Sequence, residues 1–200
     1  MRALIMVDIQ NDFLPGGALA VPRGDEIIAL ANDLATEFPL VVATQDWHPA
    51  GHESFASSHA GRRIGEVIDL HGLPQVLWPD HCIQGTHGAE FATQLNRTRI
   101  ANVFTKGEDP TVDSYSGFFD NGRRRSTGLA DWLRDHHVRE VCIIGLATDY
   151  CVKATAIDAV REGFTTTCDL RACRGVELSP GDCARAIAAM KQAGVHVVGE

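Results

Sequence analysis

The chain has 200 residues, of which 44% are hydrophobic and 22% charged, so it can bury one domain-sized core. Its formal net charge is −8, and its one basic run, 123–125, spans three residues, which argues against a nucleic-acid partner. No apolar stretch approaches the ~20 residues of a membrane span, and the first apolar run is too short for a signal peptide. These features predict a soluble cytoplasmic protein with no nucleic-acid or membrane partner.

Short apolar runs alternate with helical patterns along the chain, which is typical of a parallel sheet covered by helices on both faces. In chain order the patterns predict strands at 3–9, 40–44, 102–105, 141–146, 164–168 and 195–198, and helices at 25–37, 127–136, 149–162 and 180–193. The expected fold class is therefore α/β, a single-domain three-layer α/β/α architecture with a mostly parallel sheet of about six strands in a Rossmann-like order.

Local signals predict where the helices begin and end. Ser126 is expected to cap the second helix, and Pro180 to occupy the first position of the fourth. Gly163 and Gly194 follow predicted helix ends, where a left-handed residue is favoured.

Residues 45–96 interrupt this alternation, because they show little periodicity and contain many His, Gly, Pro and Ser residues. A connection of this length inside a compact domain is usually functional. We therefore expect one domain over 1–200 with a long insertion at about 45–96.

Three reactive side chains follow predicted strands. Asp8 ends the first strand, Lys106 ends the third, and Cys151 comes shortly after the fourth, where a helix begins. Because ligands of open α/β sheets bind at the carboxyl ends of the strands, we expect these side chains to converge.

An acid, an amine and a thiol suit nucleophilic catalysis. An ammonium and a helix N-terminus both stabilise a thiolate, and a carboxylate can take up the thiol proton and return it to a leaving amine. Gly145 and Ala147 leave backbone amides accessible for an oxyanion hole. The alternative is structural: none of the six cysteines forms a CxxC pair, and most are expected to be reduced packing residues.

At these residues the chain resembles the isochorismatase-like cysteine hydrolases, and within them the nicotinamidase/pyrazinamidase family. The resemblance covers essentially the whole chain. It is carried by residues 7–13 (VDIQNDF), 44–49 (TQDWHP), 78–82 (WPDHC), 105–107 (TKG), 145–152 (GLATDYCV) and 169–175 (DLRACRG).

The resemblance implies a catalytic triad of Asp8, Lys106 and Cys151. Cys151 would attack a carboxamide carbon, ammonia would leave, and water would hydrolyse the thioester. It also implies a cis peptide between Leu146 and Ala147, and an oxyanion hole formed by the backbone amides of Ala147 and Cys151.

A metal site is expected in the long insertion. Alternate residues of an extended chain share a side, so Asp46 and His48 can reach one ion, and His81 can join them from the far end of the insertion. The alternative is that Asp46 caps a turn and the histidines are surface residues.

In the family that the chain resembles, the metal holds the ring nitrogen of the substrate. The resemblance makes His52 a possible extra ligand. His59, His71 and His87 are interpreted as loop or surface residues. Zinc is the first expectation, with iron or manganese as alternatives.

The resemblance also implies a substrate pocket. Phe13 and Trp78 match positions that enclose the ring, Tyr115 lies where another aromatic is expected, and Leu146 precedes the nucleophile turn. For Phe13 a core role is the alternative, and Trp132 is interpreted as a core or surface residue. Cys82 follows His81, and its side chain is expected to point away from the metal.

The implied function is hydrolysis of nicotinamide to nicotinate and ammonia in NAD salvage, with pyrazinamide as a second substrate. Another amidase on the same scaffold, such as an N-carbamoyl or ureido-amide hydrolase, is the main alternative, although it would not need the metal set. A metal-binding protein with a dead site would require a missing triad residue. The oligomeric state is expected to be a monomer or a small homo-oligomer.

Overall fold

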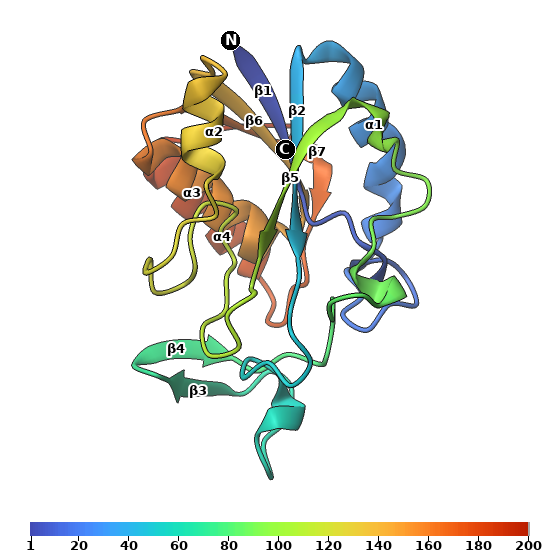
Figure 1. Cartoon of the computed structure of the whole chain (residues 1–200), viewed down its shortest axis with the longest axis vertical. Coiled ribbons are helices and arrows are strands. Elements are labelled where there is room, and N and C mark those ends of the chain that lie inside the picture. The colour runs from blue at the N-terminus through green and yellow to red at the C-terminus, as the bar shows by residue number, and fades with distance from the viewer. Residues whose placement is uncertain (200) are drawn as a thin grey trace.

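The first strand, β1 (Arg2–Val7), is an apolar run whose residues 3–7 are all fully buried. Such runs belong to parallel sheets that are covered on both faces. In the computed structural model, which describes residues 1–199, β1 lies inside a six-stranded parallel sheet of order β5-β2-β1-β6-β7-β8 (Figure 1). The other strands are β2 (Leu40–Asp46), β5 (Ile100–Lys106), β6 (Glu140–Leu146), β7 (Thr165–Arg174) and β8 (His196–Val198). Each of the six predicted strands overlaps one of these, and the predicted fold class is confirmed.

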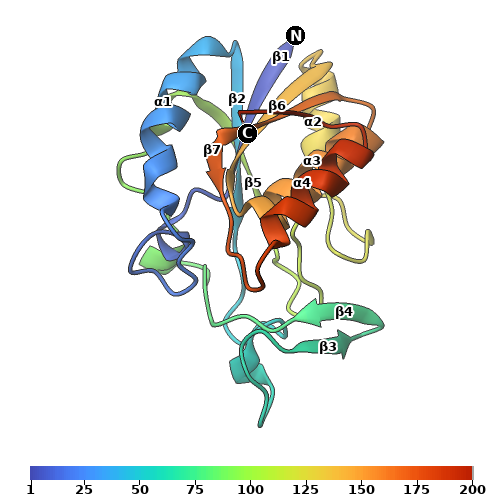
Figure 2. The ribbon, with the colours of Figure 1, turned by 180° about the vertical axis from the view of Figure 1, so that it is seen from behind.

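Helices cover both faces of the sheet. Helix α1 (Ile27–Glu37) lies on one face, and α2 (Leu129–Asp135), α3 (Lys153–Arg161) and α4 (Asp182–Gln192) lie on the other (Figures 1 and 2). Short 3-10 helices lie at Asn11–Phe13, Gly24–Glu26, Ala56–Ser58, His87–Ala89 and Arg97–Arg99, and a π-helical turn at Thr148–Val152. The four predicted helices are therefore present at the expected places in the chain.

Two predicted helix starts are wrong. Helix α2 follows Gly128 at φ 86°, and the Ser126 hydroxyl accepts the Gly128 amide (3.0 Å), so Ser126 fixes the turn before the helix. Helix α4 follows Gly181 at φ 88°, which leaves Pro180 outside the helix. In both cases the helix begins only after a glycine at positive φ, because a residue with these backbone angles is not part of a right-handed helix. Gly163 and Gly194 have φ 89° and 96°, as predicted.

The strand order reverses between β1 and β6. From β1 the chain builds outward through β2 and β5, and then returns to place β6, β7 and β8 on the other side. The two central strands approach closely at Gly145, where a Cβ would lie 2.1 Å from the Val7 carbonyl oxygen. This reversal is where open α/β sheets bind their ligands.

Residues 47 to 90 lie beyond the carboxyl ends of the strands, and the following residues return alongside α1 to the start of β5 (Figure 1). Residues 47 to 90 are less irregular than predicted, since β3 (Val67–Leu70) and β4 (Leu73–Val76) form an antiparallel hairpin. Its two-residue turn, His71-Gly72, has positive φ at both residues (52° and 85°), as a type I′ turn requires.

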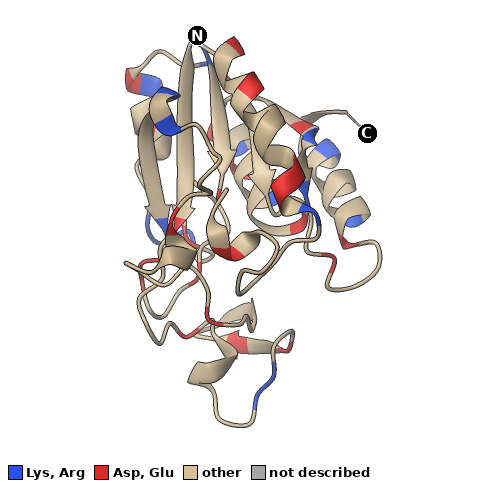
Figure 3. Cartoon of the chain, turned by 90° about the vertical axis from the view of Figure 1, so that its right-hand side faces the viewer, with Lys and Arg blue, Asp and Glu red and all other residues tan. Residues whose placement is uncertain are grey.

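Charged residues of both signs are interspersed over the helices and loops (Figure 3). Among residues 1–199, no helix combines the length and the apolar character needed to cross a membrane.

Candidate active site

The three predicted triad residues meet at the carboxyl edge of the sheet. Asp8 follows β1, Lys106 is the last residue of β5, and Cys151 lies in the turn after β6. The Lys106 ammonium lies 2.8 Å from Asp8 Oδ2 and 3.4 Å from Cys151 Sγ. All three residues are buried, so the structure brings together the set that the sequence indicated.

Further contacts fix the lysine. Lys106 Nζ donates to Asp46 Oδ1 (2.5 Å) and to the Ser114 carbonyl (3.0 Å), and Asp8 Oδ1 accepts the Thr44 hydroxyl (2.6 Å). Lys106 therefore has more acceptors than the three hydrogens of its ammonium, which holds this side chain in one place.

The charges in the cluster follow from burial and pairing. Burial opposes the ammonium of Lys106, but the carboxylates of Asp46 and Asp8 outweigh it and hold the pKa of Lys106 well above its usual value. Burial alone would raise the pKa of Asp46, yet Lys106 and His48 hold it well below the ordinary range. Burial raises the pKa of Asp8, and Lys106 only partly offsets the effect. The resting site therefore contains an ammonium, one firmly ionised carboxylate and a more basic one.

The nucleophile differs from the sequence expectation in one respect. Lys106 does lower the pKa of Cys151, but burial, together with Asp8 and Asp46, raises it well above the ordinary thiol value. Cys151 is consequently a thiol at neutral pH, and its proton must be removed during the reaction. Asp8 is suited to that task, because its own pKa is raised towards that of the group it must deprotonate.

The turn that carries Cys151 contains the expected cis peptide between Leu146 and Ala147. The amides of Tyr150 and Val152 both donate to the Ala147 carbonyl (3.1 and 3.0 Å). This turn leads directly into α3, so Cys151 lies at the N-terminal end of a helix.

Asp46, His48 and His81 form a buried cluster whose ligand atoms all lie within 4.8 Å of one another. Asp46 Oδ2 lies 3.6 Å from His48 Nε2 and 3.7 Å from His81 Nε2. The other ring nitrogens contact backbone carbonyls, His48 Nδ1 at Gly107 (3.0 Å) and His81 Nδ1 at Pro79 (2.8 Å). His48 Nε2 is buried without a hydrogen-bond partner. Two oriented imidazoles and a carboxylate fit a divalent metal with open positions for other ligands.

The remaining histidines of residues 45–96 lie outside this cluster. His52 is fully buried beside the cluster, its ring 4.6 Å from that of His48; its Nδ1 contacts Ser54 Oγ (2.8 Å), and its Nε2 has no hydrogen-bond partner. His52 is not part of the three-residue group. His59, His71 and His87 lie farther out and pair with the loop residues Glu53 and Glu90.

Asp8, Asp46 and Cys151 also present ligand atoms within 4.8 Å of one another. The Lys106 ammonium contacts all three, so an amine already occupies the position that a cation would take. Asp46 thus uses one oxygen for Lys106 and the other for the histidine cluster.

A pocket beside Cys151 has about 340 Å³ of free space, including the part open to solvent. Its wall includes the predicted residues Phe13, Trp78 and Tyr115, and also Asp46, His81 and Ala147. Trp78 packs edge-on against Tyr150, with ring centroids 4.8 Å apart. A flat heteroaromatic amide would contact aromatic rings, the thiol and the metal cluster in this one pocket.

Some pocket residues differ from the prediction. Leu146 is fully buried and does not line the pocket, because it lies inside the end of β6. Leu19, Asp113, Tyr150 and Val176 line it but were not identified from sequence. Tyr150 adjoins Cys151 and could have been found on that ground. The thiol of Cys82 lies 4.0 Å from the Gly88 carbonyl, outside the metal cluster, and Trp132 packs on Phe104.

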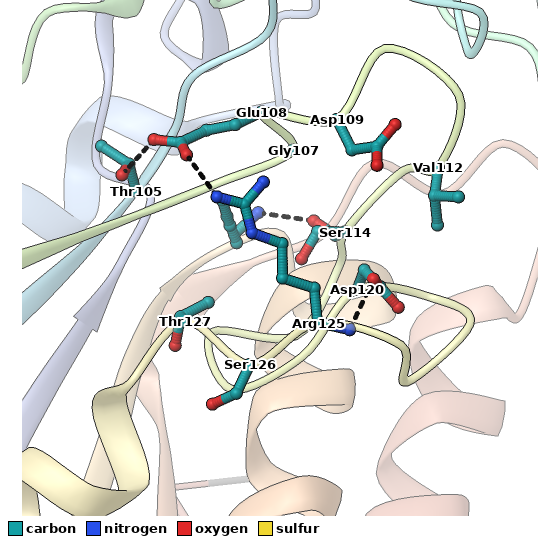
Figure 4. A pocket seen from close by; sticks show the side chains of 11 residues that line it. Thr105, Gly107, Glu108, Asp109, Val112, Ser114, Asp120, Arg125, Ser126 and Thr127 are labelled. Atoms are coloured by element: carbon teal, nitrogen blue, oxygen red, sulfur yellow. Dashed lines mark hydrogen bonds and ion pairs between the residues drawn. The ribbon is translucent and has the colours of Figure 1, made fainter.

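A second cavity, of about 510 Å³ including its open mouth, is lined by the end of β5 and by residues of the 107–127 loop (Figure 4). Arg125 extends across it towards Glu108 (3.8 Å), and the Arg125 amide donates to Asp120 (2.9 Å). Lys106 is the only predicted triad or metal residue that lines this cavity. Cys151, Asp46 and His81 line the pocket beside Cys151 and not this second cavity.

Comparisons with known proteins agree with this geometry. A family model described as Isochorismatase domain matches residues 2–199. The chain belongs to the isochorismatase family. It is 52% identical over 197 residues to a nicotinamidase of Escherichia coli (strain K12), which covers 96% of this chain and 92% of that protein. The resemblance found from sequence motifs is confirmed.

Solved structures of isochorismatase-family enzymes are also similar. A nicotinamidase/pyrazinamidase from Acinetobacter baumanii superposes with a TM-score of 0.96 at 46% identity, covering 98% of this chain and 95% of that one. A pyrazinamidase of Pyrococcus horikoshii, solved in complex with zinc, has a TM-score of 0.80 at 39% identity and covers 100% and 99% of the two chains.

Proposed function

We propose that this protein is a nicotinamidase, a metal-dependent cysteine amidohydrolase that converts nicotinamide to nicotinate and ammonia and also accepts pyrazinamide. One observation carries the proposal: Cys151 of the buried Asp8–Lys106–Cys151 cluster lines the same aromatic pocket as Asp46 and His81 of the Asp46–His48–His81 cluster. The 52% identity to a nicotinamidase supports the choice of substrate.

The first half-reaction acylates the thiol. Asp8 takes the proton of Cys151, and Sγ attacks the carboxamide carbon while the backbone amides of Ala147 and Cys151 receive the developing oxyanion. The carbon–nitrogen bond then breaks, and the proton held by Asp8 passes to the leaving amine, which departs as ammonia. Lys106 keeps its charge throughout, because its pKa is held well above the usual value.

The second half-reaction consumes water. Asp8 accepts a proton from water, the hydroxide attacks the thioester carbon, and the carbon–sulfur bond breaks. The Asp8 proton returns to the sulfur, so one water is consumed and the thiol is regenerated.

Asp46, His48 and His81 would hold one divalent metal, for which we propose zinc, with iron or manganese as alternatives. The metal would bind the ring nitrogen of the substrate and so favour pyridine and pyrazine carboxamides. The unpartnered Nε2 of His52 makes this residue a possible extra ligand.

The other candidate functions fit this arrangement less well. An N-carbamoyl or ureido-amide hydrolase would have no use for a metal cluster in the wall of its pocket. A metal-binding protein without catalytic activity would need an incomplete triad, whereas Lys106 contacts both Asp8 and Cys151.

The decisive measurement is ammonia release from nicotinamide by metal-loaded protein, with Cys151→Ala and Cys142→Ala compared. Cys142 lies on β6 outside the pocket, so its variant should keep full activity, whereas Cys151→Ala should release none. Absence of release from wild-type protein would refute the proposed substrate, and undiminished release from Cys151→Ala would refute the mechanism.

A further inference from the structure

Gln75, on the hairpin strand β4, is a buried amide in an otherwise largely exposed element. It is 2% exposed, while its strand neighbours are half-buried or exposed. The two hydrogens of its Nε2 are shared among three acceptors: the Val76 carbonyl (2.7 Å), Asp113 Oδ2 (2.9 Å) and the Tyr115 hydroxyl (3.2 Å). Two of these acceptors come from a loop about 40 residues further along the chain.

Both distant acceptors are pocket residues. Asp113 and Tyr115 line the pocket that holds Cys151, together with Trp78. Asp113 Oδ1 accepts the Ser114 amide (2.7 Å), and the Tyr115 oxygen also accepts Trp78 Nε1 (3.1 Å). Gln75 itself does not line the pocket, so it can act on a ligand only through these side chains.

Two donors on one phenolic oxygen restrict the tyrosine strongly. They occupy its acceptor positions, and in residues 1–199 no hydrogen bond donated by the Tyr115 hydroxyl is present. Burial and the nearby Asp113 carboxylate raise the pKa of Tyr115 well above the phenol value, so the group keeps its hydrogen. Without the Gln75 amide, the buried Asp113 carboxylate would lose a donor and compete for that hydroxyl hydrogen.

We propose that Gln75 is a positioning residue of the substrate pocket: by bridging Asp113 and Tyr115 it fixes the aromatic wall against which the substrate ring packs. The β3–β4 hairpin thereby contributes to affinity for the ring, although no hairpin residue touches the thiol. The inference rests on the proposed function in its choice of nicotinamide as the ligand.

A double-mutant cycle tests this role. Gln75→Leu removes the donor at similar volume, and Tyr115→Phe removes the acceptor while keeping the ring. Gln75→Leu should raise KM for nicotinamide about 5- to 10-fold with kcat changed less than about twofold, the effect expected from a lost buried hydrogen bond. In the Tyr115→Phe background the same substitution should raise KM clearly less.

Binding of the product gives a second readout. The Kd for nicotinate, measured by calorimetry, should rise with KM in Gln75→Leu. Gln94→Leu, at an exposed position outside the pocket, is the matched control and should change neither constant. If Gln75→Leu fails to fold, Gln75→Met repeats the test with an unbranched side chain.

The outcomes separate the proposals. An equal rise of KM in both tyrosine backgrounds, or a loss confined to kcat or to thermal stability, would overturn the role of Gln75 and leave the nicotinamidase proposal standing. A wild-type protein that neither hydrolyses nicotinamide nor binds nicotinate would overturn both.

Discussion

The proposed catalytic triad and the proposed metal cluster lie side by side but are built differently. Asp8 and Lys106 stand at the ends of parallel strands, and Cys151 follows a third, so sheet pairing fixes their backbone. His48 and His81 belong to residues 47–99, where the regular pairing consists of one short hairpin and isolated bridges. In the second region the positions depend on individual side chain–backbone hydrogen bonds, such as that of His48 with Gly107.

This difference matches the two roles proposed for the regions, proton transfer and recognition of the ring. The proposed proton transfer between sulfur, carboxylate and a leaving group tolerates little displacement, and its residues stand at the ends of paired strands. The proposed recognition of the ring depends on residues of a connecting segment, and such segments can vary in length and sequence without disturbing the sheet. Asp46 joins the two regions, because one of its oxygens contacts Lys106 and the other faces the histidines.

The largest effect is expected in the strand-end region, from Asp8→Asn. An amide cannot accept the Cys151 proton, so kcat/KM should fall by about 10²- to 10⁴-fold, the usual range for loss of a general base. Steady-state ammonia release measures the loss, and Asp33→Asn, at an exposed position on α1, is the matched control. Activity within a few-fold of wild type would contradict the assigned base.

His81→Ala should affect mainly the insertion region. Loss of one of three ligands should lower the bound metal per chain, measured by elemental analysis, and should reduce kcat/KM for nicotinamide by about 10- to 100-fold, chiefly through KM. His87→Ala, an exposed histidine of the same segment, should change neither quantity. Unchanged metal content in His81→Ala would refute the assigned site.

When the metal site is kept saturated, the acid side of the pH dependence should report the strand-end residue Asp8. Because burial raises the pKa of Asp8 above 3.8, kcat/KM should fall about tenfold per unit as the pH drops through this raised pKa, where protonated Asp8 can no longer act as a base. A pH–rate profile of metal-saturated enzyme measures this limb. An acid limb with its midpoint at or below 3.8 would contradict the assignment.

The last prediction concerns stability rather than activity, at Gly107, the junction of the two regions. This residue follows Lys106 at φ 70°, and a Cβ there would lie 2.4 Å from the His48 ring. Gly107→Ala should therefore lower the free energy of unfolding by about 2–4 kcal/mol, more than the ~1 kcal/mol expected for Gly163→Ala, whose φ is also positive but whose surroundings are open. Urea unfolding of both variants measures the difference, and equal losses would show that the His48 contact is relieved without cost.

Much of the fold could be predicted from sequence. Buried parallel strands are nearly continuous apolar runs, and the polar residue that ends each run marks the end of the strand. The helix starts were less certain, since Gly128 and Gly181 delay α2 and α4 in ways that the caps alone do not indicate. The hairpin β3–β4 was missed because its strands are four residues long and β4 contains Pro74. The His71-Gly72 turn between them is the signal that could have revealed it.

The sequence by itself determined which groups can react: an acid, an amine and a thiol at strand ends, and a carboxylate with two histidines in the insertion. Only the tertiary structure decided their charge states, because the pKa of Cys151 depends on burial that no local pattern encodes. It alone also brought Asp46 between the two clusters and placed Gln75 behind the pocket wall. Such contacts join residues about 40 or more positions apart, and they are fixed by packing of the whole chain rather than by the residues next to them.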